Sequence, residues 1–246
     1  MLPPRPSPRA CGAGASAYAQ YRAALAEGRP RRLLVRTVLT LAAAVAVSWV
    51  WGWRVGLAAA VLVAVADTVH RWRTHEAVRT WRKGALGERR TARMLRPLAR
   101  RGYTILHDRA IPGSRANVDH LVIGGGGVFV VDTKHWGRDR RVTRRGRYVR
   151  VGRASGDQVA RAVRYEAARV SELLTRSAGR RVEVTPVLAI HGPSVPMLRV
   201  MKANGVPMLR ASQVRGWIAR RPVRLSPAET AALIEAAGRL LPPYTG

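Results

Sequence analysis

The hydrophobic and polar positions divide the chain into one long apolar segment and a longer region of mixed pattern. Residues 37–66 carry a single charge, Arg54. One helix of this length would be about 45 Å long, against a bilayer core of about 30 Å, and would place Arg54 near its middle. The pattern favours two membrane spans, residues 33–51 and 55–69, joined by a turn at 51–54. One tilted span and a soluble pair of buried helices are the alternatives.

Basic residues flank this apolar segment on both sides, at positions 29–36 and 71–83. The positive-inside rule then places both flanks in the cytoplasm, and Trp49, Trp51 and Trp53 suit a membrane interface. We therefore expect a cell-membrane protein with two spans and both termini in the cytoplasm. Residues 1–32 would form a mobile arm, residues 33–72 would contact the lipid bilayer, and residues 73–83 would form a basic linker.

From Gly84 onward the pattern predicts one α/β domain, residues 84–246. Its helices are expected at 85–101, with a kink at Pro97, at 155–177, and after Ser226, where Ser-Pro-Ala-Glu is a capping box. Strands are expected at 103–107, 182–190 and 206–209. Apolar runs at 118–123 and 128–133 surround four glycines and predict a β-hairpin, and residues 140–151 predict a second, basic hairpin that turns near 145–146.

The glycine hairpin has a definite predicted register. If the turn is centred between Gly125 and Gly126, partners have numbers that sum to 251. This pairs Asp119 with Asp132, Asn117 with Lys134, Leu121 with Val130, and Ile123 with Val128. The opposite face carries Val118, His120, Val122, Phe129 and Val131, where His120 is interpreted as a core histidine. A hairpin that is apolar on both faces is typical of a central strand pair covered by helices.

Two carboxylates opposite each other on neighbouring strands repel, because their Cβ atoms lie about 5 Å apart. A proton, a basic side chain or a divalent cation relieves the repulsion, and Mg²⁺ suits a site of one or two carboxylates with retained water. Lys134 shares this face, and Glu88 on the preceding helix would complete the site. The alternative is structural: Asp119 pairs with Lys134, and Asp132 caps the strand edge.

Three motifs occur in order: Gly87-Glu88, Asn117-Val118-Asp119-His120, and the run from Gly127 to Lys134. Together they resemble the nuclease-related domain family, whose core is similar to the PD-(D/E)xK nucleases of restriction-endonuclease-like fold. The resemblance implies a mixed sheet flanked by helices and a metal-dependent phosphodiesterase site. In that site Asp119 and Asp132 bind Mg²⁺ or Mn²⁺, Lys134 is the catalytic lysine, and Glu88 and Gln158 contribute. Val118 replaces the proline of the motif, and Asp132 stands where this family more often has glutamate.

The excess of positive charge indicates a polyanionic partner. The chain has 44 Lys+Arg against 14 Asp+Glu, a net charge of +30. A GC-rich genome would also raise the arginine content. The segment 138–153 nevertheless concentrates eight arginines with one acidic residue, which favours contact with a phosphate backbone. The predicted nucleic-acid contacts are Arg138, Arg140, Arg141, Arg144, Arg145, Arg147 and Arg150, and Tyr148 would stack on a base or pack locally. The single cysteine excludes a disulfide scaffold and a cysteine-based zinc site.

The sequence therefore predicts a membrane-anchored hydrolase, a DNA-binding nuclease that cuts phosphodiester bonds with Mg²⁺. The alternative is a non-catalytic, arginine-rich module at the membrane that binds nucleic acid or an anionic surface.

Overall fold

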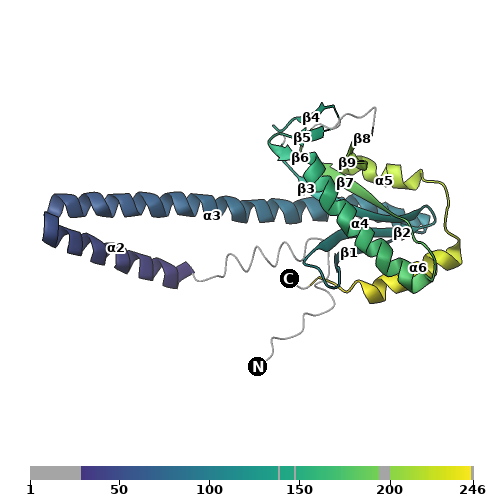
Figure 1. Ribbon diagram of the computed structural model, residues 1–246, viewed down its shortest axis with the longest axis horizontal. Helices are drawn as coiled ribbons and strands as arrows, with labels where there is room; N and C mark the ends of the chain where they lie inside the picture. Colours follow the sequence, from purple (N-terminus) through teal and green to yellow (C-terminus); the bar gives the residue numbers. More distant parts are fainter. Residues whose placement is uncertain (1–28, 138, 147, 194–199, 245–246) are drawn as a thin grey trace, which may run out of the picture. The chain divides into compact units, whose positions relative to one another are not determined.

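The computed structural model describes residues 29–137, 139–146, 148–193 and 200–244 (Figure 1). The chain divides into two compact units. One lies within Ala17–Arg82, and the other contains Lys83–Gly246.

The first unit contains two helices joined by a tight turn. Helix α2 (Arg29–Trp51) and helix α3 (Trp53–Leu95) are joined at Gly52, whose φ of 85° is left-handed. The two helices approach closely beside the turn. A Cβ atom at Gly56 would lie 1.8 Å from Ser48 Oγ, so only glycine permits this contact.

The two predicted membrane spans are not supported. Within the described residues, the structure has no helix with the length and apolar character needed to cross a bilayer. The second apolar helix was predicted to end near Val69. In the structure, helix α3 continues through an arginine-rich stretch to Leu95. The bilayer contact predicted for residues 33–72 is therefore not supported either, and location in the cell membrane with cytoplasmic termini stays a prediction.

The second unit is built on a mixed six-stranded sheet with strand order β1-β2-β3-β7-β9-β8. Neighbouring pairs are antiparallel except for β3–β7 and β7–β9. The strands are β1 (Thr104–Ala110), β2 (Asn117–Gly124), β3 (Gly127–His135), β7 (Val184–His191), β8 (Met201–Ala203) and β9 (Val206–Arg210). This confirms the α/β fold with a mixed sheet flanked by helices.

The glycine hairpin has the predicted register as far as His120 and Val131, and the predicted pairs Asp119–Asp132 and Asn117–Lys134 lie beyond the paired residues. Leu121 pairs with Val130, Ile123 with Val128, and Gly124 with Gly127. The hairpin lies inside the sheet, as its two apolar faces predict, since β1 flanks β2 and β7 flanks β3. One assignment was wrong: Val118 packs in the cluster that contains Leu121, rather than with Val122.

Helices cover both faces of the sheet (Figure 1). Helices α4 (Gly156–Ala178) and α6 (Pro227–Leu240) pack on the face that carries Leu121 and Val130. The end of α3, the 3-10 helix η2 (Arg96–Arg101) and α5 (Ala211–Ala219) cover the face that carries Phe129 and Val131. Pro97 lies in η2, so the predicted kink takes the form of a 3-10 turn. The capping box at Ser226 is present as predicted.

A separate three-stranded sheet precedes α4. It consists of β4 (Val142–Arg145), β5 (Tyr148–Val151) and β6 (Ala154–Ser155), all antiparallel. The first two strands are the predicted basic hairpin. The sequence did not predict the third strand of this sheet, nor β8 or α5. Strand β6 has only two residues, and no side chain caps the start of α5.

Candidate active site

Asp119, Asp132 and Lys134 come together where the β2–β3 hairpin opens. The backbone pairing of these strands ends at His120 and Val131. Beyond that point the Thr133 N–H donates to Asp119 Oδ2 at 2.8 Å, so a side chain continues the contact between the strands. Lys134 Nζ donates to Asp132 Oδ1 at 2.8 Å. The structural alternative assigned Lys134 to Asp119, and the structure pairs it with Asp132 instead.

One oxygen of this cluster is left without a partner. The Asp132 side chain is only 6% exposed, and its buried Oδ2 has no hydrogen-bond donor among the residues that the structure describes. A buried carboxylate oxygen without a donor costs free energy. The orphaned oxygen therefore indicates a place for a cation or a proton.

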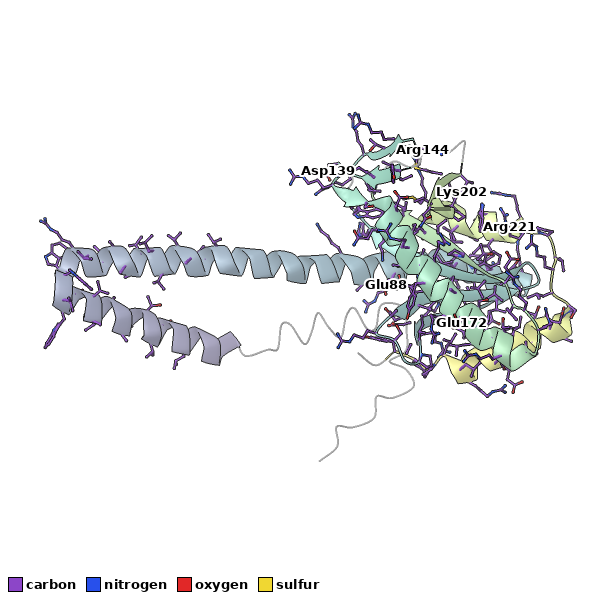
Figure 2. The ribbon with its side chains drawn as sticks, in the orientation of Figure 1. Glu88, Asp139, Arg144, Glu172, Lys202 and Arg221 are labelled. Atoms are coloured by element: carbon purple, nitrogen blue, oxygen red, sulfur yellow. The ribbon has the colours of Figure 1, made fainter. Side chains whose placement is uncertain are left out.

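Two glutamates from different helices lie within electrostatic range of Asp132. Burial and the charges of Asp108 and Asp132 raise the pKa of Glu88, on α3, to about 7. Burial and the charge of Asp132 raise the pKa of Glu166, on α4, to about 8. Figure 2 places Glu88 where α3 meets the sheet. Sequence reasoning found Glu88 but missed Glu166, although Glu166 interrupts the apolar face formed by Val163, Ala167 and Val170.

Asp108 is a further acidic residue that sequence reasoning missed. It lies in β1, it is buried, and its φ of 51° is unusual for a residue other than glycine. Its Oδ1 accepts a hydrogen bond from Asn117 Nδ2 at 3.0 Å. Since its charge raises the pKa of Glu88, Asp108 belongs to the acidic surroundings of the site. Strained backbone of this kind is concentrated at functional sites.

The remaining ionisable groups respond to the same crowding. Burial and the charges of Asp132 and Glu88 raise the pKa of Asp119 well above its usual range. Burial alone would lower the pKa of the Lys134 ammonium, but the charges of Asp132 and Asp119 outweigh burial and raise it. Lys134 is therefore a permanent cation near neutral pH in this arrangement, rather than a base.

Gln158 lies apart from these residues. It is exposed in the first turn of α4, where its backbone N–H donates to Ser155 Oγ at 3.3 Å. Glu166 follows eight residues later, about 12 Å along the helix. The structure does not bring Gln158 into the acidic cluster, and its role in the site stays a prediction.

A hydrogen-bonded network of histidine and threonine side chains links strands β1, β2, β3 and β7 next to the acidic residues. His120 is fully buried on the opposite face, as predicted, and is hydrogen-bonded to His107 at 2.8 Å and to Thr133 at 3.3 Å. Thr133 continues the chain to Thr91 at 3.1 Å, and Thr91 to His191 at 2.8 Å. Thr133 thus connects the acidic cluster with the histidine network, because its backbone N–H binds Asp119 and its hydroxyl binds His120 and Thr91.

Five of the seven predicted phosphate-binding arginines lie on or beside the small sheet. Arg138 and Arg147 are outside the described residues. The other five have exposed side chains: Arg140, Arg141, Arg144, Arg145 and Arg150. Asp139 lies 3.8 Å from Arg140 Nε and offsets little of this charge.

Two carboxylates of the cluster could hold a metal ion. Within the part of the chain that the structure describes, no three His, Cys, Asp or Glu side chains form a ready metal-binding group. Asp119 and Asp132 are the pair that could hold a cation, and Mg²⁺ needs only one or two carboxylates when it retains water.

Comparison with known proteins agrees with this geometry. Residues 83–191 match the family model of the nuclease-related domain. This part of the chain is a nuclease-related domain. It includes Glu88, Asp119, Asp132, Lys134 and Glu166, and it is consistent with the PD-(D/E)xK-like superfamily.

The chain is also similar to an uncharacterized protein of Bacillus anthracis, with 40% identity over 57 residues. That alignment covers 22% of this chain and 27% of the relative, so the chain spans about a quarter of that protein's length. No solved structure matches the chain.

Proposed function

We propose that the nuclease-related domain hydrolyses phosphodiester bonds of DNA with a bound Mg²⁺ or Mn²⁺. The observation that carries this proposal is the buried, donor-free Asp132 Oδ2 beside Lys134 and three carboxyl groups with raised pKa values. A divalent cation stabilises such a crowded group of acids, and the family match suggests a nuclease-like function.

The donor set suits the proposed metal. Asp119 and Asp132 would hold it, since both supply carboxylate oxygens and Asp132 Oδ2 has no other partner. Magnesium favours oxygen ligands of this kind. When bound, the ion supplies Lewis acidity toward phosphate and lowers the pKa of water.

The protein's own residues supply the rest. Lys134 stays protonated, so its ammonium stabilises negative charge that develops on a phosphate oxygen. The Thr133 N–H holds Asp119 in place through its hydrogen bond to Oδ2. Without a metal, the pKa values of Glu88 and Glu166 are about 7 and about 8. A bound cation would lower both pKa values, so their carboxylates would be available to accept a proton from water.

Cleavage of plasmid DNA by the full chain tests this proposal. In Mg²⁺, Asp132→Asn and Lys134→Met should each lower the cleavage rate at least about 100-fold, because each removes charge that acts at the reacting phosphate. Glu172→Gln is the matched control, since Glu172 is an exposed acid on α4 paired with Arg169. Cleavage that survives in both site variants, or a loss in Glu172→Gln of the same size, would contradict the assignment.

The exposed arginines support a second candidate, a module that binds nucleic acid or another anionic surface without cutting it. Such binding depends on Arg140, Arg141, Arg144, Arg145 and Arg150, and needs no metal. It predicts salt-sensitive DNA binding that is equal in Asp132→Asn and the wild-type protein, with no cleavage in Mg²⁺ or Mn²⁺.

A further inference from the structure

The small sheet β4–β5–β6 has two unlike faces. Val149 and Val151 are buried in the cluster that includes Ala160 and Val163 of α4. Tyr148 and Arg150 alternate with these valines on β5 and therefore point the other way. Tyr148 is 55% exposed. The inner face thus holds the sheet on the domain, and the outer face is turned toward solvent.

The strand register gives this outer face its chemistry. Arg145 is directly opposite Tyr148, and Thr143 is directly opposite Arg150. Ser155 of β6 pairs with Arg150 from the other side. Side chains directly opposite in an antiparallel pair share a face. One surface therefore presents an aromatic ring, two guanidinium groups and two hydroxyl groups.

A groove of about 810 Å³ borders this surface. It is lined by Thr143, Arg145, Tyr148, Arg150 and Ser155 together with Arg144 and Val149, which are paired on the other face. Asp157 also lines the groove, and its Oδ2 accepts the Val149 N–H at 3.4 Å. A cavity of this size accommodates a small organic ligand. Its exposed side chains are those that bind nucleotides, with the ring stacking on a base and the guanidinium groups binding phosphates.

The groove is fixed relative to the acidic cluster, because β6 runs directly into α4. A Cβ atom at Gly156 would lie 2.9 Å from Val149 O, so the first residue of the helix packs tightly on β5. Glu166 follows Gly156 by ten residues, about 15 Å along α4. A stacked strand rises about 3.4 Å per nucleotide, so four to five nucleotides cover that length.

We propose that this outer face holds unpaired nucleotides of a single DNA strand, with a base stacked on Tyr148 and phosphates bound by Arg145 and Arg150. This face would position a strand for the proposed nuclease, so cleavage of the bound strand rests on the proposed function. In a duplex, the faces of the bases are covered by their neighbours, so a tyrosine ring does not reach them without unstacking. Single-stranded DNA, or a frayed or looped region of duplex, is therefore the preferred ligand.

The test compares Tyr148→Ala and Tyr148→Phe with Tyr165→Ala in the full chain. Tyr165 is the control because it is 49% exposed and lies on α4, outside the groove. Binding of a fluorescent oligothymidine of about 15 nucleotides, and of a duplex of the same length, is measured by anisotropy without divalent cations. Tyr148→Ala should weaken oligothymidine binding by about tenfold, while Tyr148→Phe and Tyr165→Ala stay within about twofold of wild type.

Duplex binding by Tyr148→Ala should change less than about twofold, because phosphate contacts dominate it. Unchanged oligothymidine binding in Tyr148→Ala overturns the inference, and so does an equal loss for oligothymidine and duplex. A loss in Tyr148→Phe as large as in Tyr148→Ala also overturns it, since the ring remains. These measurements need no metal and no cleavage. A wild-type protein that never cuts DNA would therefore remove the proposed reaction and leave the Tyr148 comparison to decide the binding site.

Discussion

At the scale of single residues, the site is defined by an imbalance of charge. Lys134 is the cation that pairs with Asp132, yet Asp119, Glu88 and Glu166 all have raised pKa values around the same carboxylate. One ammonium group does not compensate four acids in a partly buried cluster. Burial is the largest cause of these raised pKa values, and repulsion by Asp132 adds to it. A divalent cation at Asp132 Oδ2 would relieve that repulsion.

Replacement of Glu166 by glutamine tests this imbalance. The folded pKa of Glu166, about 8, lies above its ordinary value of 4.5, so the stability it contributes is present below pH 4.5 and is lost as pH rises toward 8. Glutamine mimics the protonated form at every pH. Without divalent cations, the melting temperature of Glu166→Gln should match wild type near pH 5 and exceed it by several degrees near pH 9.

Glu172→Gln is the control for this comparison, because Glu172 is an exposed acid on the same helix. The difference in melting temperature between Glu172→Gln and wild type should not grow with pH. A constant difference between Glu166→Gln and wild type across this pH range would show that Glu166 does not titrate in the cluster.

At the scale of elements, the sequence was sufficient where the interactions are local. The glycine bend fixes the register of β2 and β3 from the turn to His120 and Val131, which places Asp119 and Asp132 at the end of the paired strands. The capping box and the basic hairpin are local for the same reason.

Asp108 and Glu166 were missed because their approach depends on how β1 and α4 pack on the hairpin. That packing involves residues distant in sequence, and no spacing rule encodes it. The expected end of the second apolar helix was also wrong, since the arginine-rich stretch after Val69 has no proline before Pro97 and α3 continues through Gly84 and Gly87 to Leu95.

The attachment of the small sheet to α4 depends on Gly156. Gly156→Ala places a Cβ atom 2.9 Å from Val149 O and 3.2 Å from Val149 Cβ, so the sheet or the helix has to shift. We expect a loss of about 1–3 kcal/mol in the free energy of unfolding, measured by denaturant titration. Gly238→Ala, in α6 with open space around it, should instead stabilise by about 0.5–1 kcal/mol. Destabilisation of equal size by both changes would contradict the close packing at Gly156.

At the scale of the whole molecule, the acidic cluster and the buried histidines respond to pH in opposite directions. Burial lowers the pKa values of His107, His120 and His191, so their contribution to stability is present above pH 6.5 and is lost as pH falls. The carboxyl groups with raised pKa values instead lose their contribution to the stability of the fold as pH rises. Without a cation, stability should therefore decline on the alkaline side of neutrality, where only the carboxyl groups titrate, and a bound divalent cation should reverse that decline.

Calorimetric titration of the full chain with Mg²⁺ at pH 7, in two buffers of different ionisation enthalpy, measures this linkage most directly. Glu88 and Glu166, with pKa values of about 7 and about 8, carry protons in part at pH 7, and a cation would displace them. The account predicts saturable binding of one Mg²⁺ with release of protons, and loss of both signals in Asp132→Asn but not in Glu172→Gln. Absence of binding, or binding that is equal in Asp132→Asn and wild type with no proton released, would contradict a metal site at Asp119 and Asp132.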